Sequence, residues 1–230
     1  PFIAKGKTAF KGSTAVSLSS VDKNAIIYFS LGGEFQKYTR PLIISEKATL
    51  AVYAQKGSTK SAVITTDFYK IDPNLKIDLQ TSYANQYNAG GDNALIDGVL
   101  GTEDFRTGTW QGYFDSDVVA VVDLGSKKKI NEVAIGFLQD QRSWIFYPTA
   151  VSCLVSNDGV NFQAYPNGNR TINSIIETAA ITLKRVQFKG AGSFRYVKVI
   201  AKKLGVLPTW HLGYKHDGRS WLFVDEIQIQ

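Results

Sequence analysis

The chain has 230 residues, of which 44% are hydrophobic and 20% are charged, and its formal net charge is +6. These values are typical of a globular protein, so extended disorder, a collagen-like repeat and a coiled coil are excluded. Apolar runs such as residues 118–122 have the length of a strand, well short of the roughly 18 residues that span a bilayer. The chain starts at Pro1 with neither an initiator Met nor an apolar signal region, which predicts a fragment of a longer, processed precursor.

Short β-rich segments separated by turn residues run through the first part of the chain. Candidate strands cover residues 15–18, 25–30, 41–44, 48–55 and 61–70. This number of short strands predicts a small β-sandwich. Proline and polar residues then interrupt the pattern at residues 71–74, so the predicted domains are residues 1–72 and 73–230.

Strands are also predicted throughout the second part, at residues 118–124, 130–138, 150–156, 181–188, 194–201 and 221–230. Several of these segments alternate apolar and polar side chains, which is typical of strands with one face on a core and the other in water. No window keeps a 3.6-residue apolar period for more than two turns. The chain is therefore predicted to be all-β, with the small sandwich followed by a jelly-roll-like β-sandwich.

Charge and cysteine content narrow the possible functions. Residues 1–72 hold ten Lys or Arg against five Asp or Glu, whereas residues 73–230 hold sixteen against fifteen. No Arg-rich stripe or aromatic–basic motif accompanies the positive charge, so nucleic acid is not a predicted partner. The one basic cluster, residues 127–129, is typical of a solvated turn. Cys153 is the only cysteine, which excludes an intrachain disulfide, and its alternating surroundings predict a buried, inert thiol.

Long loops rich in aromatic and polar residues join the strands of the second part, at residues 86–98, 101–114, 139–148 and 204–220. Ordered loops of this length usually carry function. Sugar recognition needs a flat aromatic face for the apolar side of a pyranose, flanked by planar charged or amide groups that bond to its hydroxyls. The loops supply both, which predicts a carbohydrate site made by Trp110, Asp140, Arg142, Trp144, Phe146, Trp210, His211 and Arg219.

Several of these residues have a second interpretation. Trp110 borders a strand and can instead pack in the core or at its rim. Arg142 can simply pair with Asp140 at the surface, and His211 can be an ordinary hydrogen-bonded loop residue. Catalysis within this chain is not predicted, because no Gly-x-Ser-x-Gly, zincin or phosphate-loop motif accompanies the acidic residues near the loops.

Residues 93–102 combine an acidic side chain, Asp97, with a tight glycine-rich turn. Such a turn leaves several carbonyl oxygens free to point inward, and Ca²⁺ in proteins commonly binds carboxylates mixed with main-chain carbonyls. From the spacing alone, an aspartate-capped turn is the preferred interpretation.

A set of motifs runs in order through the second part: residues 93–98, Trp110, and residues 121–125, 155–162, 194–199 and 224–229. This set resembles discoidin domains, also called coagulation-factor type C domains, a family that includes bacterial galactose-type carbohydrate-binding modules. The resemblance implies a discoidin-like jelly roll that binds carbohydrate. The paired cysteines that tie the termini of animal discoidins are missing, as they are in the bacterial modules.

The same resemblance implies a structural calcium ion. In that family, carbonyls and an Asp of the first loop hold the ion together with a Glu from the last strand. Carried onto this sequence, the implied ligands are the carbonyl oxygens of Ala94, Val99, Thr102 and Asp225 and the side chains of Asp97 and Glu226.

Residues 27–30, 38–42 and 48–54 make the first part resemble the small carboxy-terminal sandwich of chitobiase-like β-hexosaminidases. An Asp-Gly-Ser turn usual in that family is Leu-Gly-Gly at residues 31–33 here. Those enzymes keep their catalytic residues in a separate barrel. The resemblance therefore implies that this chain is part of a secreted, periplasmic or cell-surface bacterial glycoside hydrolase.

Together these expectations describe a non-catalytic, carbohydrate-binding fragment of a β-hexosaminidase-type enzyme. It would bind a glycan that contains galactose or N-acetylhexosamine and would hold its partner in cis, the parent catalytic domain, near the substrate. The alternative is a structural or protein-interaction module whose loops pack on that catalytic domain. A membrane is not a predicted partner, because residues 202–207 are the only segment that joins basic residues to an apolar loop tip.

Overall fold

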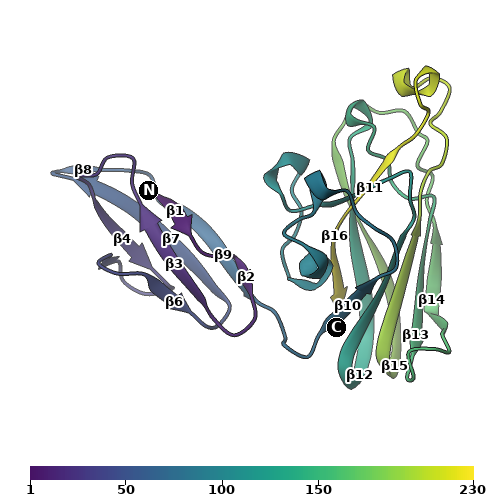
Figure 1. The fold of residues 1–230 in the computed structure, drawn as a ribbon, viewed down its shortest axis with the longest axis horizontal. Helices are drawn as coiled ribbons and strands as arrows, with labels where there is room; N and C mark the ends of the chain where they lie inside the picture. Colours follow the sequence, from purple (N-terminus) through teal and green to yellow (C-terminus); the bar gives the residue numbers. More distant parts are fainter. The chain divides into compact units, whose positions relative to one another are not determined.

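The computed structural model describes all 230 residues, and strands are its dominant regular structure. The chain forms two compact units, Pro1–Pro73 and Asn74–Gln230 (Figure 1). Each unit has its own hydrophobic core. The division falls within the interruption at residues 71–74. All helical segments are short 3₁₀ turns, and none of them has the length and apolar character of a membrane span.

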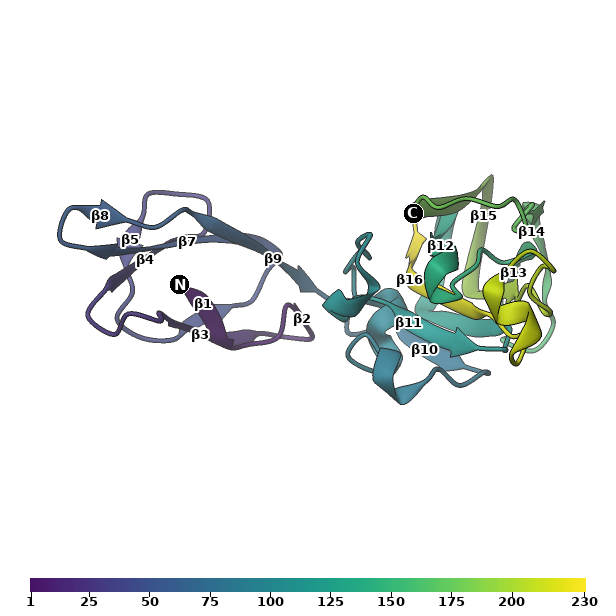
Figure 2. The same ribbon diagram turned by 90° about the horizontal axis from the view of Figure 1, so that it is seen from above.

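The first unit consists of two small sheets, drawn one above the other in Figure 2. One sheet has the order β1 (Phe2–Lys5), β3 (Thr14–Ser19), β6 (Leu42–Ile44). The other has the order β2 (Ala9–Phe10), β9 (Ile64–Lys70), β7 (Ala48–Lys56), β4 (Ile26–Ser30), β5 (Gln36–Lys37), and β8 (Thr59–Lys60) pairs with β7. Alternation along β7 directs Leu50 and Val52 into the core and Tyr53 outward.

The core of the first unit is small. Its buried side chains are Phe10, Val16, Leu18, Ile44, Leu50, Val52 and Phe68. Full burial of such a side chain contributes roughly 1.5–3 kcal/mol, so the unit depends on a few contacts.

The second unit is built around two long strands, β12 (Val118–Gln139) and β15 (Thr182–Lys202), which pair in antiparallel orientation from Val118↔Ala201 to Gln139↔Thr182. The other strands are β10 (Lys76–Leu79), β11 (Gln111–Phe114), β13 (Ala150–Ser156), β14 (Gln163–Thr171) and β16 (Trp221–Ile229). β16 pairs with the second half of β12, and β11 pairs with β16. β10 pairs with the first half of β12, β13 with the second half of β15, and β14 with β13. The sheet therefore curls into two layers, which confirms the predicted all-β sandwich (Figure 1).

The sequence predicts two strands where the structure has one, both in β12 and in β15. β12 bends at Gly125, whose φ is +77°, and its register against β15 shifts between Asp123 and Lys128 and again between Ile130 and Glu132. A bulged corner of this kind turns a strand without ending it. The exposed lysines 127–129 lie in this corner, within β12, rather than in a turn between strands.

The core of the second unit lies between its two layers and gathers 24 buried side chains, against seven in the first unit. Cys153 is fully buried in it. Burial raises the pKa of the Cys153 thiol to about 12, so the prediction of a buried, unreactive thiol is confirmed.

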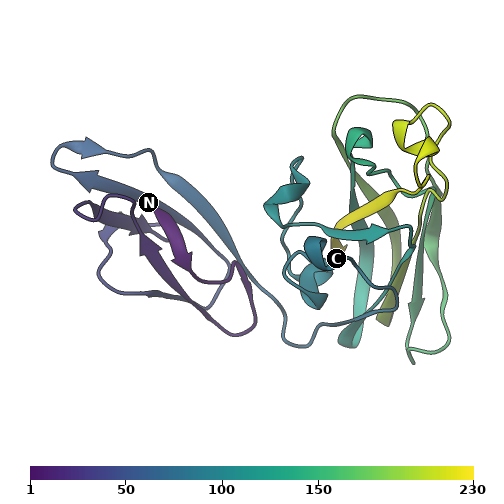
Figure 3. The same cartoon turned by 45° about the horizontal axis from the view of Figure 1, so that its top comes forward.

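Five 3₁₀ turns lie in the loops of the second unit: η1 (Asn85–Tyr87), η2 (Asp92–Ile96), η3 (Phe105–Thr107), η4 (Gln141–Ser143) and η5 (Leu212–Lys215). The loops that hold η4 and η5 lie at the same end of this unit, the top in Figures 1 and 3. η2 lies against β16 and β10. The loops thus bring predicted site residues together in two separate regions.

Candidate functional site

The loop after β12 is tight and hydrogen-bonded. Asp140 and Ile145 bond to each other in both directions, with N–H to carbonyl oxygen distances of 3.1 Å. The carboxylate of Asp140 is buried in the loop, where Oδ2 accepts from the Ser143 hydroxyl at 2.7 Å and Oδ1 lies 4.0 Å from Nε of Arg142. Asp140 therefore holds the loop together, whereas Arg142 is exposed to solvent.

His211 joins this loop to the one that holds η5. Its Nδ1 accepts from the Gly213 N–H at 3.0 Å, so its Nε2 carries the proton and donates to the Gln141 carbonyl at 2.6 Å. The side chain is 8% exposed. Both ring nitrogens are occupied, which corrects the expectation that His211 contacts sugar: it fixes η4 beside η5.

Trp144 packs across the same two loops. Its backbone has φ +62°, a left-handed conformation that costs an L-residue roughly 1–2 kcal/mol. The indole lies so close to Gly213 that a Cβ there would overlap its Nε1, and the ring meets His211 edge-on with centroids 5.3 Å apart. Trp144 is half-buried, so part of its surface remains open to a ligand.

Two other aromatic residues of the predicted site lie in the interior. Phe146 is 1% exposed, and its ring packs against Trp210 with centroids 6.3 Å apart. Trp110 is 2% exposed, clusters with Phe223, and donates from Nε1 to the Thr102 carbonyl at 2.9 Å. Neither ring presents a face to solvent, which corrects the expectation that they contact sugar. Both side chains pack in the interior beneath the surface loops.

Three predicted residues lie at the surface of this end: Arg142, Trp210 and Arg219. Trp210 is 38% exposed. The guanidinium of Arg219 lies 5.9 Å from the centroid of the Phe114 ring, a cation–π contact that restricts its orientation.

A pocket with a volume of about 510 Å³ opens beside Arg219. Its lining residues are Asp115, Lys203, Gly205, Val206, Tyr214, His216, Asp217, Gly218 and Arg219. Tyr214 is 41% exposed. Nζ of Lys203 bonds to the Asp115 carboxylate at 2.5 Å and to the Asp115 carbonyl at 2.7 Å. The pocket therefore combines an open aromatic ring, a fixed ion pair and a guanidinium.

Sequence reasoning did not select Tyr214, Lys203 or Asp115 for this site. Tyr214 lies in the same aromatic and polar run as Trp210 and His211, so its composition was a usable signal. Lys203 follows β15 and Asp115 follows β11, and nothing in their local sequence indicates that they meet.

The predicted metal ligands lie in a separate region, around η2 and β16. Oε2 of Glu226 accepts from the Asp97 N–H at 3.1 Å, and Oδ1 of Asp97 accepts from the Val99 N–H at 2.8 Å. Burial raises the pKa of Asp97 to about 6 and that of Glu226 to about 9, and neighbouring carboxyl groups add to both shifts. No Lys or Arg pairs with either carboxyl.

Asp225, the third carboxyl group of this region, is held by partners of its own. Its carboxylate bonds to Arg185 at 2.8 Å and accepts from the Gly101 N–H at 2.9 Å. Gly136 makes room for it, because a Cβ there would overlap Oδ1 of Asp225. No group of three or more His, Cys, Asp or Glu side chains converges in the chain. An ion at this place would therefore bind two carboxylates and main-chain carbonyls.

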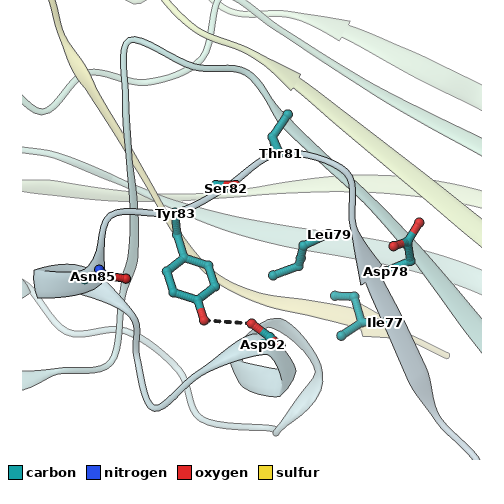
Figure 4. A pocket seen from close by; sticks show the side chains of 8 residues that line it. All are labelled: Ile77, Asp78, Leu79, Thr81, Ser82, Tyr83, Asn85 and Asp92. Atoms are coloured by element: carbon teal, nitrogen blue, oxygen red, sulfur yellow. Dashed lines mark hydrogen bonds between the residues drawn. The ribbon is translucent and has the colours of Figure 1, made fainter.

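A second hollow, with a volume of about 420 Å³, lies beside β10 (Figure 4). The Tyr83 hydroxyl donates to Asp92 at 2.7 Å across it, and this bond raises the pKa of Tyr83. Its charged lining residues are Asp78 and Asp92, and no residue of the predicted carbohydrate or metal site lines it.

A family model described as the F5/8 type C domain matches residues 77–227. Among solved structures, CpGH89CBM32-6 produced by Clostridium perfringens is 16% identical, with 69% of this chain and 94% of that chain covered and a TM-score of 0.40. A chitosan-binding module 1 derived from a chitosanase/glucanase of Paenibacillus sp. IK-5 is 15% identical, with 68% and 95% covered and a TM-score of 0.40. A pectin-binding carbohydrate-binding module is 15% identical, with 70% and 91% covered and a TM-score of 0.42. No curated protein matches the chain.

Proposed function

Because this chain belongs to the F5/8 type C domain family, we propose that its second unit is a non-catalytic carbohydrate-binding module. The observation that carries the proposal is the pocket beside Arg219, where the open ring of Tyr214 lies among charged and planar groups. A pyranose has an apolar face that suits an aromatic ring and hydroxyls that suit a guanidinium and carboxylates. Arg142 and Trp210, exposed at the same end, would extend contact to further sugars of a glycan.

Several side chains that line the pocket are preorganised in the ligand-free chain. The ion pair between Lys203 and Asp115 and the contact of Arg219 with Phe114 already restrict these side chains. Little side-chain freedom is then lost on binding, which favours affinity. A single shallow site still binds weakly, so its use would be to keep a linked catalytic domain near its substrate.

A glycan-array screen of the whole chain tests this function, with Tyr214→Ala as the probe variant. We expect binding to at least one class of glycans that contain galactose or N-acetylhexosamine. We expect Tyr214→Ala to lose that binding. Phe2→Ala is the matched control, because Phe2 is similarly exposed, 45% against 41% for Tyr214, but lies in the first unit. A folded chain that binds no glycan would sink the proposal.

A structural calcium ion belongs to the same proposal. The donor set fits Ca²⁺, a hard cation that binds oxygen: the Glu226 side chain is buried, Asp97 is half-buried, and neither carboxyl has a cationic partner. The carbonyls of Ala94, Val99, Thr102 and Asp225 would complete the set, and the Thr102 carbonyl has a second lone pair beyond the one that accepts from Trp110. The ion would supply positive charge to the two carboxylates and fix the η2 loop on β16.

The parent protein and its location are also part of the proposal. The resemblance of residues 27–54 to chitobiase-like enzymes supports a β-hexosaminidase-type glycoside hydrolase that is secreted, periplasmic or at the bacterial cell surface. The catalytic domain of that parent would be the partner in cis. The complete reading frame tests this directly, and a catalytic domain of another class would contradict it.

A structural or docking role has one observation in its favour. Leu212, Ile175 and Ile176 are exposed aliphatic residues, and the Ile176 carbonyl is bound by Gln141 of the η4 loop. Apolar side chains at the loop end would suit packing on a neighbouring domain. Leu212→Asp separates the two functions, because it would weaken docking in the full-length parent and leave glycan binding by this chain unchanged.

A further inference from the structure

The outward face of the larger sheet in the first unit carries aromatic side chains. In β4, Ile27 and Phe29 pack against the core, so Tyr28 between them points outward. Tyr53 of β7 lies directly opposite Tyr28, and Lys37 of β5 lies opposite Tyr28 on its other side. Residues directly opposite in neighbouring strands share one face of a sheet. One row of side chains therefore crosses three strands.

Three rings make a continuous surface on this face. Tyr28 and Tyr53 stack with centroids 5.0 Å apart and an interplanar angle of 12°. Phe35 meets Tyr53 edge-on with centroids 4.9 Å apart, and it is 41% exposed. We call Tyr28, Phe35 and Tyr53 the aromatic face. Because the rings hold one another in place, a ligand would lose little affinity to ordering them.

Lysines border the aromatic face on two sides. Nζ of Lys60 lies 5.2 Å from the centroid of Tyr53, and Lys37 stands at the other end of the row. Neither lysine pairs with a carboxylate. Elsewhere in this unit, by contrast, Lys56 pairs with Asp22 at 2.8 Å. The charges of Lys37 and Lys60 are therefore available to a ligand.

Acidic residues do little to neutralise this charge. Asp67 points outward on β9, but its carboxylate accepts from the Thr49 hydroxyl at 2.6 Å, away from the row of rings. Glu34 is next to Phe35 in the chain, and it forms no ion pair with Lys37 or Lys60. The unit as a whole has ten Lys or Arg against five Asp or Glu. A ligand of negative charge is favoured at this surface.

We propose that the aromatic face, bordered by Lys37 and Lys60, binds an anionic polysaccharide whose sugars carry carboxylate or sulfate groups. The apolar faces of the sugars pack on the rings, and their acidic groups pair with the lysines. A neutral polysaccharide leaves both lysines without partners, and a simple anion leaves the rings in water. The site lies in the first unit and stands independently of the function proposed for the second.

Binding sites on both units make the chain bivalent toward a long glycan. Once one unit is bound, the other meets the same polymer at a high effective concentration, so the overall affinity exceeds that of either site. The first unit is then a binding module in its own right.

The experiment measures binding of the whole chain to polygalacturonate and to neutral dextran by affinity electrophoresis and calorimetry. All chains carry Tyr214→Ala and Arg219→Ala, so that the pocket of the second unit does not contribute. We expect Lys37→Glu with Lys60→Glu to weaken binding to polygalacturonate at least about tenfold, and Phe35→Ala to weaken it severalfold. The matched control, Lys5→Glu with Lys7→Glu, makes the same charge change at exposed positions outside the aromatic face and leaves binding unchanged.

Each other outcome overturns the proposal. If Lys37→Glu with Lys60→Glu and Lys5→Glu with Lys7→Glu weakened binding equally, the binding would come from nonspecific electrostatic attraction to the positively charged unit. Unweakened binding by Phe35→Ala would lead to the same conclusion. Tight binding of dextran that ignores the lysine variants would assign the face to neutral glycans. Sedimentation that shows a dimer dissociated by Phe35→Ala would assign it to a second copy of the chain. The effect of Tyr214→Ala in the glycan-array screen tests only the pocket of the second unit. The proposals for the two units can therefore fail separately.

Discussion

The two loop regions of the second unit use polar residues in opposite ways. Around η2, the side chains of Asp225 and Glu226 are buried and Asp97 is half-buried, and Asp225 pairs with the partly exposed Arg185. Around η4 and η5, Arg142 and Arg219 point outward, and only their supports, such as His211, are buried. An inward charge needs a partner if the fold is to be stable. An outward charge is free to meet a ligand, so we expect the first region to affect mainly stability and the second to affect mainly the proposed binding.

The largest expected effect comes from removing the buried carboxylate of Asp225, which pairs with Arg185. Asp225→Ala leaves Arg185 without its partner and the Gly101 N–H without an acceptor. We expect the free energy of unfolding to fall by about 3–5 kcal/mol, measured by urea denaturation. The control is Asp123→Ala, which removes a more exposed pair with Arg195 and should cost less than about 1 kcal/mol. Equal losses in both variants would contradict the contrast between inward and outward charges.

Calcium is expected to stabilise the loop region around η2, where the buried carboxyl groups lie. At a concentration of about 100 times its Kd, the ion adds about 2.7 kcal/mol to the free energy of unfolding. The measurement is the Tm of the chain in Ca²⁺ and in chelator, for the parent and for Glu226→Gln, which should respond little to Ca²⁺. Glu132→Gln, at a surface pair with Lys189, should keep the full response. If the Tm of the parent chain did not change with Ca²⁺, the proposed calcium site would be ruled out.

Gly213→Ala tests the support beneath the outward region. The new Cβ overlaps the Trp144 indole and forces the η4 and η5 loops apart. Overpacking of this kind costs about 1–3 kcal/mol, and we expect glycan binding to fall with stability, as read by calorimetry and thermal melts. Tyr214→Ala should lose binding with its Tm unchanged. Gly33→Ala adds a methyl group in open space and should change neither quantity.

The smallest effect concerns acid stability of an exposed turn. A hydrogen bond from the Asn161 side chain, with N–H bonds from Val160 and Asn161, holds the pKa of Asp158 well below its ordinary value of 3.8. A carboxyl with a lowered pKa stabilises the fold above its ordinary pKa, and this contribution is lost as the pH falls below it. Urea midpoints of the parent and Asp158→Asn should therefore differ slightly at pH 6 and converge toward pH 2. If the difference between the two urea midpoints grew as the pH fell, the predicted pH dependence would have the wrong sign.

Local pattern was enough to predict part of the fold. Residues 150–156 alternate and are bounded by Pro148 and residues 157–159, and β13 covers the same residues. β14 was missed because its sequence holds Pro166, Asn167 and Gly168, residues that are typical of turns. β12 was divided because Gly125 and the lysines after it look like a chain reversal. Only the pairing partner reveals a bulged corner.

The candidate site was predictable in its location and less so in its contacts. Composition directed attention to the two loops that do lie together, around Trp144 and Trp210. Whether a loop aromatic points outward depends on tertiary packing, so Phe146 could not be distinguished from Tyr214 in the sequence, whereas the position of Trp110 at the border of a strand already allowed for packing in the core. The same limit applies to His211, whose two hydrogen bonds come from residues that only the folded loops bring near.

The long strands β12 and β15 each run through both layers of the second unit. Neither layer can open while these two strands keep their shared ladder, and once the ladder breaks, both layers lose their central strands together. We therefore expect the amide hydrogens of β10 and β16, which pair with opposite halves of β12, to exchange with solvent in one concerted opening. Two layers that differ in position then behave as a single cooperative folding unit.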